Sequence, residues 1–336
     1  MKSHEYEVSG RDLARLAARL AARVAGPVVL FAVLMRLGAV SGLSPSPWPA
    51  LDLDRTILTH QANASRNPND SDIVLIGDSS CLMDVSAVKL NQHLGDRHRP
   101  LNLGTFMYLG FGGYASMLAR YNDVNPGRVR VVVLLVHPEM LRGIEPVSSY
   151  LLLLSDLYAG TDPSEPGSVH GQLCGLLGLN IFQNRFLARC PLPLPGQYGR
   201  LYGFNLDLYN YMERARGSAV DPHQYVPASG QGDAEYRLSP ALESACLAFR
   251  AAVPARASLL VGITPVPESF AAPNYPAKAK QILRQYGQWL QADCLTNLPP
   301  TLPDALFAST THLNQQGSET YTEILAQCLE PHLRAK

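Results

Sequence analysis

The stretch Ile73-Val74-Leu75-Ile76-Gly77-Asp78-Ser79-Ser80 decides the fold. Its first four residues are branched and apolar, which is typical of a strand buried on both faces of a parallel sheet. The run stops at Gly77, and small polar residues precede a helix that we expect to begin near Asp84 or Ser86. A buried strand that turns into a helix places the turn at the carboxyl edge of an open α/β sheet, where such sheets carry their sites.

The turn after this strand holds a candidate nucleophile. A serine at this position projects its hydroxyl into the crevice at the sheet edge, close to the first free N–H groups of the helix, which can stabilise an oxyanion. Gly-Asp-Ser-Ser is also an ordinary turn composition. Ser79 is therefore a catalytic candidate only if a histidine base and oxyanion donors occur elsewhere in the chain.

Strand and helix patterns alternate through the rest of the chain. This alternation predicts an α/β fold of three layers, with a parallel sheet flanked by helices and joined by right-handed crossovers. The expected strands are 73–76, a short one ending at Gly104, 129–136 and 257–266, and the expected helices are 86–94, 114–122, 240–253 and 277–294.

Residues 143–237 interrupt this pattern with nearly a hundred positions of little periodicity, which is too long for an ordinary loop. We interpret them as an insertion over the carboxyl edge of the sheet. The stretch is rich in tyrosine and proline, and two interpretations stay open for its aromatic residues. They form either a platform for carbohydrate or a small aromatic core of their own.

The N-terminus divides into three segments. Residues 1–23 carry arginines every four positions and predict a basic amphipathic segment on the cytoplasmic side. Residues 24–43 hold a single charge, Arg36, and twenty helical residues match a bilayer core of about 30 Å. Residues 44–70 begin with Ser-Pro-Ser-Pro-Trp-Pro and are expected to form a stalk, which leaves 71–336 as the globular domain.

This arrangement predicts a transmembrane signal anchor in the inner membrane, crossing it once, with the main domain in the periplasm or otherwise outside the cytoplasm. A cleaved signal peptide and a soluble amphipathic helix are the alternatives, because the uninterrupted apolar run is only twelve residues. Six cysteines fit an oxidising compartment, and some of them can form disulfides, whereas Cys81 is expected to be free and buried.

Composition excludes several functional classes. The formal net charge is zero, so no general attraction to nucleic acid is expected. The cysteines and histidines do not have the spacing of metal ligands, and the sequence predicts neither a metal nor a cofactor.

Two later motifs supply the partners that Ser79 needs. Leu101-Asn102-Leu103-Gly104 follows the first helix, and His312-Leu313-Asn314-Gln315-Gln316-Gly317 precedes a final helical run. Together with Gly77-Asp78-Ser79, this ordered set resembles the SGNH (GDSL-type) hydrolase superfamily over roughly residues 72–329. The resemblance implies that Ser79 is the nucleophile and His312 the base. It also implies oxyanion donors in the N–H groups of Gly104 and of Ser79 or Ser80.

Two positions depart from the family pattern. The third block of the family carries an asparagine donor after a strand, whereas strand 129–136 here runs into His137-Pro138-Glu139. The acid three residues before the histidine is replaced by Ser309, and the nearest upstream acid is Asp304. A serine carries no charge to stabilise the imidazolium, so we expect a slow Ser79–His312 dyad whose imidazole is oriented by a backbone carbonyl near Ser309. The side chain of Asp304 is the alternative, and it would make a displaced triad. Residues beside the site that can contact substrate are Asp78, Asn102, His137 and Glu139.

A membrane-tethered SGNH domain with a changed third block looks like the proteins that O-acetylate or otherwise acylate, or deacylate, secreted polysaccharides and cell-envelope polymers. This resemblance implies a polysaccharide or acyl-ester substrate and a membrane-bound O-acyltransferase as partner. A secreted carboxylesterase or lipase is one alternative. A catalytically inactive scaffold that binds polysaccharide or the membrane partner is another.

Overall fold

Five parallel strands form the central sheet of the computed structural model, which describes residues 19, 23–27, 29–31, 33–34, 53–159, 208–209, 211–221, 223–226 and 236–334. Their order is β2 (Pro100–Asn102), β1 (Ile73–Gly77), β3 (Val131–Val136), β4 (Ser258–Ile263) and β6 (Asp293–Cys294). Numbered along the chain within this sheet, the order is 2-1-3-4-5, as in flavodoxin-like doubly wound folds. The predicted α/β class and parallel sheet are confirmed.

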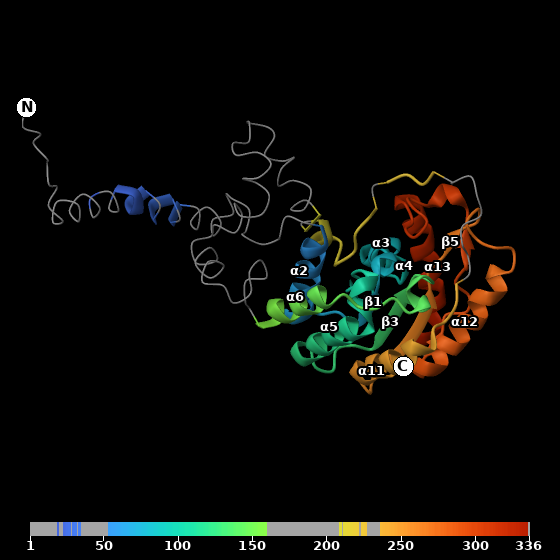
Figure 1. The fold of residues 1–336 in the computed structure, drawn as a ribbon. Helices are drawn as coiled ribbons and strands as arrows, with labels where there is room; N and C mark the ends of the chain where they lie inside the picture. The colour runs from blue at the N-terminus through green and yellow to red at the C-terminus, as the bar shows by residue number, and fades with distance from the viewer. Residues whose placement is uncertain are drawn as a thin grey trace, which may run out of the picture.

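Alternate residues of the strands enter two separate cores, because successive side chains of a strand point to opposite faces. Val74, Ile76, Val132 and Leu134 pack against α2 (Leu53–Arg66), α5 (Gly110–Val124), α11 (Glu243–Ala252) and α12 (Tyr275–Leu290). Ile73, Leu75, Val131 and Val133 pack against α4 (Ala87–His93) and α13 (Gln315–Arg334). Figure 1 shows α3, α4 and α13 above the strands and α5 and α11 below them.

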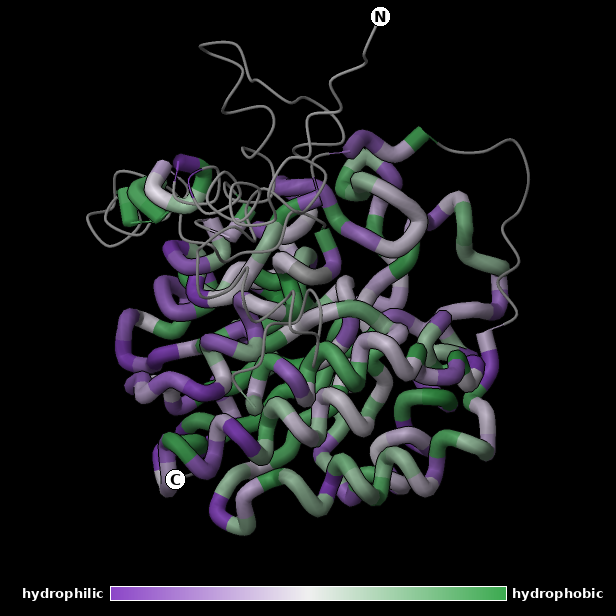
Figure 2. Tube along the Cα trace, turned by 60° about the vertical axis from the view of Figure 1, so that its left-hand side comes forward, coloured by the Kyte–Doolittle hydropathy of each residue, from purple (hydrophilic) through white to green (hydrophobic). Residues whose placement is uncertain are grey.

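Short elements complete the domain. They are α3 (Ser79–Asp84), α6 (Ser148–Ala159), the second parallel pair β5 (Val266–Pro267) and β7 (Thr301–Leu302), and the 3-10 turns η1 (Met107–Leu109), η2 (Met140–Arg142), η3 (Pro240–Leu242) and η4 (Asp304–Leu306). Figure 2 shows many hydrophobic segments inside the domain and many hydrophilic ones along its outside.

The predicted helix 86–94 is confirmed as α4, which Ser86 caps. The structure adds a short helix before it, α3, which begins at Ser79 because the Asp78 side chain caps it there. The end of the predicted helix 277–294 is wrong. Residues 293–294 form the edge strand β6 and do not extend the helix before them.

The predicted stalk of residues 44–70 is also wrong in part, because residues 53–66 form α2 and pack on the domain. The inward face of α2 includes Thr56, His60, Gln61 and Ser65, all buried. The polar groups of Gln61 and Ser65 are satisfied internally, for example by a hydrogen bond from Gln61 Nε2 to the Gly104 carbonyl at 2.7 Å. Only Ile57, Leu58 and Ala62 are apolar among the buried residues of α2, so the apolar periodicity by which a packed helix is recognised is weak.

Much of the predicted membrane span, 24–43, and most of the insertion, 143–237, lie outside the described residues. Residues 23–27, 29–31 and 33–34 are helical and exposed. Over the described ranges, we find no helix with the length and apolar character needed to cross a bilayer. Cys81, Cys246, Cys294 and Cys328 are free thiols, and Cys81 is buried as predicted, while Cys174 and Cys190 lie outside the described ranges.

Candidate active site

The turn after β1 places Ser79 at the first position of α3. Gly77 has a φ of +155°, and a Cβ atom there would lie 1.7 Å from the Leu135 carbonyl oxygen, so only glycine fits. The Asp78 carboxylate then accepts the Ser80 N–H at 3.1 Å and caps the helix. Ser79 is left half-buried at the carboxyl edge, where the strand order reverses between β1 and β3.

His312 reaches Ser79 from the loop between η4 and α13. Its Nε2 lies 2.9 Å from Ser79 Oγ, although the two residues are 233 positions apart in sequence. The loop is fixed on both sides of the histidine. The Leu313 N–H donates to Asp84 Oδ1 at 2.8 Å, and the Ala308 N–H donates to the His312 carbonyl at 2.9 Å. The predicted pairing of these two side chains is therefore present in the structure.

Asp221 completes a chain of hydrogen bonds through the imidazole. Its Oδ2 lies 2.8 Å from His312 Nδ1, and only 8% of the side chain is exposed. A carboxylate can only accept, so this bond assigns the ring proton to Nδ1 and leaves the Nε2 lone pair facing the Ser79 hydroxyl. Ser79, His312 and Asp221 thus have the connectivity of a serine–histidine–acid triad.

The backbone of residues 216–221 is held by contacts with distant elements. The Arg216 carbonyl accepts the Asn102 N–H at 2.9 Å, and the Ala219 N–H donates to the Leu82 carbonyl at 2.9 Å. Gly217 has a φ of +87°, and a Cβ there would lie 1.9 Å from the Asn102 carbonyl oxygen. This segment therefore runs against the β2 edge of the sheet and delivers Asp221 to the carboxyl end.

Asp221 is held as a carboxylate. Burial alone would raise its pKa, but hydrogen bonds from the His312 ring, from the His223 N–H and from the His223 ring outweigh burial, helped by the charge of His312. The net effect lowers the pKa of Asp221 well below its ordinary value. A group that stays ionised across neutral and mildly acidic pH can stabilise a transient imidazolium at His312.

The structure contradicts both predicted partners for the His312 ring. Asp304 lies in η4, where its Oδ1 accepts the Ser269 N–H at 3.0 Å. Ser309 Oγ accepts the His312 backbone N–H at 3.0 Å and so shapes the loop without contacting the ring. The expected Ser79–His312 dyad is wrong because Asp221, which the sequence analysis missed, contacts His312 Nδ1.

Two of the expected oxyanion donors are already engaged. The Gly104 N–H donates to Asn102 Oδ1 at 2.8 Å, and the Ser80 N–H donates to the Asp78 carboxylate. A Cβ at Gly104 would lie 2.5 Å from the Leu82 N atom, so this glycine permits the close approach of α3. Asn102 is fully buried and braces the same region, since its Nδ2 donates to the Cys81 carbonyl at 2.8 Å. As the first residue of α3, Ser79 has an N–H without an intrahelical acceptor.

Asp78 ties the turn to the end of β3. It is fully buried, its Oδ2 accepts the His137 N–H at 2.8 Å, and its Oδ1 accepts the Ser80 hydroxyl at 2.6 Å. Burial raises the pKa of Asp78, against the lowering effect of these hydrogen bonds and of the His312 charge. Asp78 therefore holds the turn that positions Ser79. Because it is fully buried beneath the site, it is not placed to contact substrate.

His137 is a buried neutral imidazole. Its Nδ1 accepts the Glu139 N–H at 3.2 Å, so the ring proton is assigned to Nε2, which makes no hydrogen bond within the described part of the chain. Burial, followed by the charge of His312, lowers the pKa of His137 to about 3, while the Thr310 carbonyl acts weakly in the other direction. Glu139 is half-buried and forms an ion pair with Arg142 at 3.1 Å.

Comparison of the sequence with models of protein families found no match, and comparison with curated proteins found no significant relative.

Proposed function

We propose that this protein is an SGNH-type acyl-transfer enzyme in which Ser79 forms an acyl-ester intermediate. The observation that carries the proposal is the chain of hydrogen bonds from Asp221 through His312 to Ser79. A serine hydroxyl is a weak nucleophile at neutral pH and needs a base within hydrogen-bond reach. The three residues come from separate parts of the chain. In the assigned tautomer, Asp221 accepts from His312 Nδ1, and His312 Nε2 accepts from the Ser79 hydroxyl, an arrangement that a purely structural role does not require.

In the proposed reaction, His312 Nε2 takes the Ser79 proton as Ser79 Oγ attacks the ester carbonyl of the donor. The tetrahedral oxyanion accepts the Ser79 N–H, and Asp221 stabilises the imidazolium. Collapse breaks the ester bond, and the alcohol leaves with the proton from His312. An incoming hydroxyl gives its proton to His312 as its oxygen attacks the acyl-serine, and His312 passes that proton to Ser79 Oγ as the acyl–Oγ bond breaks.

The order of sequence motifs supports the same family. Gly77-Asp78-Ser79, Asn102 to Gly104 and the His312 loop all surround the carboxyl edge. Asp221 supplies the acid that the sequence pattern lacks. The geometry therefore favours an active enzyme over an inactive scaffold, which would have no need for a histidine held in the basic tautomer.

We further propose that residues 24–43 anchor the chain once in the inner membrane and that the domain works outside the cytoplasm. The basic segment before residue 24 and the exposed apolar side chains of Val29, Leu30, Phe31 and Leu34 support this topology. A membrane-held acyl-transfer domain suits the O-acylation or deacylation of a polysaccharide or cell-envelope polymer, beside a membrane-bound O-acyltransferase. A secreted esterase or lipase uses the same triad, and the acceptor decides between the two.

The test uses the full chain in detergent with a chromogenic acetyl ester, with and without an oligosaccharide acceptor. Ser79→Ala should lower the rate by about 10⁶, as is common for loss of a triad nucleophile. Ser155→Ala, at an exposed position of α6, is the matched control and should keep wild-type activity. Faster product formation with the oligosaccharide identifies a transferase, and no effect of the acceptor identifies an esterase. Wild-type activity in Ser79→Ala would refute the proposal.

A further inference from the structure

Five large apolar side chains remain exposed together at the starts of α2, η1 and α6. We name this group the apolar edge patch; its members are Leu53, Tyr108, Val147, Leu151 and Leu152. Leu152 is the most exposed of them, at 65%. Only three other large apolar side chains are exposed in the described part of the domain from residue 53 onward, namely Tyr211, Val226 and Leu247.

Direct contacts hold the three elements of the patch together. The Val147 N–H donates to the Tyr108 carbonyl at 2.8 Å, which joins the start of α6 to η1. The Tyr150 hydroxyl donates to the Asp54 carboxylate, which joins α6 to the first turn of α2. The patch is therefore one surface, in which the nearest carboxylate of α2, Asp54, already has a partner.

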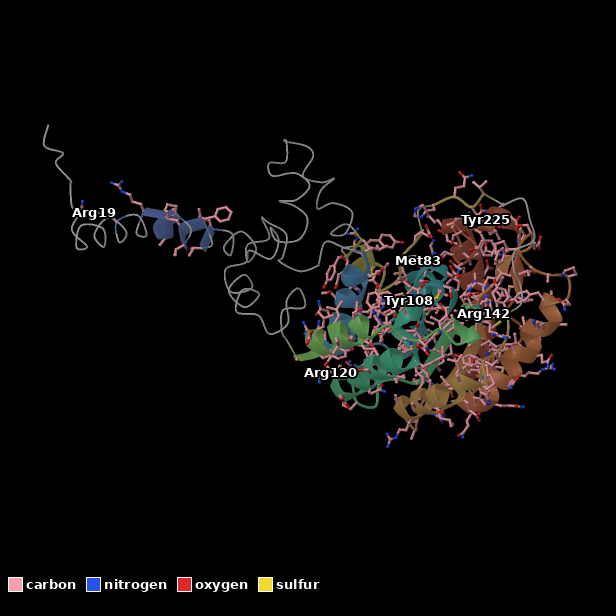
Figure 3. All side chains as sticks on the ribbon, viewed as in Figure 1. Arg19, Met83, Tyr108, Arg120, Arg142 and Tyr225 are labelled. Carbon is pink, nitrogen blue, oxygen red and sulfur yellow. The ribbon has the colours of Figure 1, made fainter. Side chains whose placement is uncertain are left out.

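The patch lies at the same edge of the sheet as Ser79. Helix α2 leads into β1, and just after its end the Asn69 N–H donates to Asn125, which lies beyond the end of α5. Gln61 Nε2 contacts the Gly104 carbonyl just beyond the end of β2. Leu53 lies eight residues earlier in the helix, about 12 Å further out along its axis. Figure 3 places Tyr108 at one end of the η1–α5 unit and Arg120 toward the other.

The chain also enters the domain from this edge. Nine residues, 44–52, separate the proposed anchor from α2. Fully extended, they span at most about 32 Å. The start of α2 must therefore stay within that distance of the bilayer, and the carboxyl edge is the edge that the anchor draws toward the membrane.

We propose that the apolar edge patch rests on the surface of the bilayer that holds residues 24–43, so that the Ser79 edge faces the lipid headgroups. This inference rests on the anchor of the proposed function. Aromatic and aliphatic side chains without free charge are those that enter the interfacial region of a bilayer. The donor ester of the reaction is then one presented at the membrane surface.

The experiment places the full chain in phosphatidylcholine vesicles that contain lipids brominated on their acyl chains. Trp48→Phe and Trp289→Phe remove the native indoles, and Leu152→Trp adds a reporter to the patch. Leu247→Trp, at a similarly exposed leucine of α11, is the matched control. The proposal predicts at least twofold stronger quenching of the Leu152→Trp variant than of the control. Equal quenching in chains that float with the vesicles would overturn the proposal and leave the proposed function standing.

A second pair of variants ties the patch to turnover. Leu152→Glu should lower the rate at least tenfold on an ester embedded in vesicles, with an unchanged rate on a water-soluble ester, whereas Leu247→Glu should change neither. An equal rate on embedded ester for both variants would contradict the proposal, as would a second copy of the chain cross-linked over the patch. If the chains do not float with the vesicles, the anchor and this inference are both refuted. If the wild type binds the vesicles but does not turn over the soluble ester, only the acyl-transfer function is refuted.

Discussion

The turn that carries Ser79 and the segment that carries Asp221 serve the same histidine but differ in how much of their support is local. At the turn, Asp78 caps the helix locally through the Ser80 N–H, while Gly77 and Asp78 also contact the neighbouring strand β3 at Leu135 and His137. In the segment 216–221, the constraints are long-range hydrogen bonds to β2, α2 and α3. The first region depends on α3 and on the adjacent strands β1 and β3, whereas the second depends on three further contacts that are distant in sequence from it.

The largest expected effect separates Asp221 from Asp304. Asp221→Asn removes the charge beside His312 Nδ1 and lets the ring adopt the wrong tautomer, so the rate of ester turnover should fall by about 10⁴. Asp304→Asn is the matched control, because Asp304 contacts only a distant backbone N–H. Initial rates of the two variants with the soluble acetyl ester make the comparison. An Asp304→Asn variant as damaged as Asp221→Asn would show that the acid has been assigned wrongly.

A smaller effect is expected from the backbone of the segment. Gly217→Ala would place a Cβ against the Asn102 carbonyl in a left-handed conformation, so the free energy of unfolding should fall by more than about 1 kcal/mol. Turnover should fall as well, because Asp221 moves with the segment. Gly112→Ala is the control, since a Cβ there meets nothing within 4 Å and alanine favours the helix. Chemical denaturation measures the free energy of unfolding of both variants. Equal stability of the two would contradict the close packing of Gly217 against Asn102.

The smallest effect concerns Asp84, which joins the helix of the Ser79 turn to the His312 loop through the Leu313 N–H. Burial raises the pKa of Asp84 well above its ordinary value of 3.8, against the lowering effect of the Leu313 N–H, and the charges of Asp78 and Asp221 add to the rise. The folded protein therefore keeps a proton that the unfolded chain has lost. This contribution to stability is full below pH about 4 and is lost as the pH rises toward the folded pKa.

Asp84→Asn keeps an acceptor for Leu313 and removes this proton linkage. Between about pH 4 and pH 7, the Tm of the variant should fall less than the Tm of the wild type. Thermal unfolding followed by circular dichroism at several pH values measures the difference. Parallel curves for the two proteins would mean that Asp84 is ionised in the folded state.

The two regions also differ in what the sequence could predict. The apolar run 73–76, the small turn and the glycine at position 77 are local signals, and they located both the strand and Ser79. His312 was found because it precedes the last amphipathic helix in a familiar motif. Asp221 lies 91 residues before its histidine, in a stretch without periodicity, and its role depends on contacts that only the folded chain creates. Helix α2 was missed for a different reason, since more of its buried residues are polar than apolar.

The central claim is that Asp221 and His312 make Ser79 the nucleophile. The most direct measurement is the rate at which a fluorophosphonate probe labels the full chain, with the modified residue identified by peptide mass spectrometry. The account predicts a single adduct on Ser79, formed much more slowly in Asp221→Asn and at the wild-type rate in Asp304→Asn. An adduct on Ser80, or labelling that does not depend on Asp221, would contradict it.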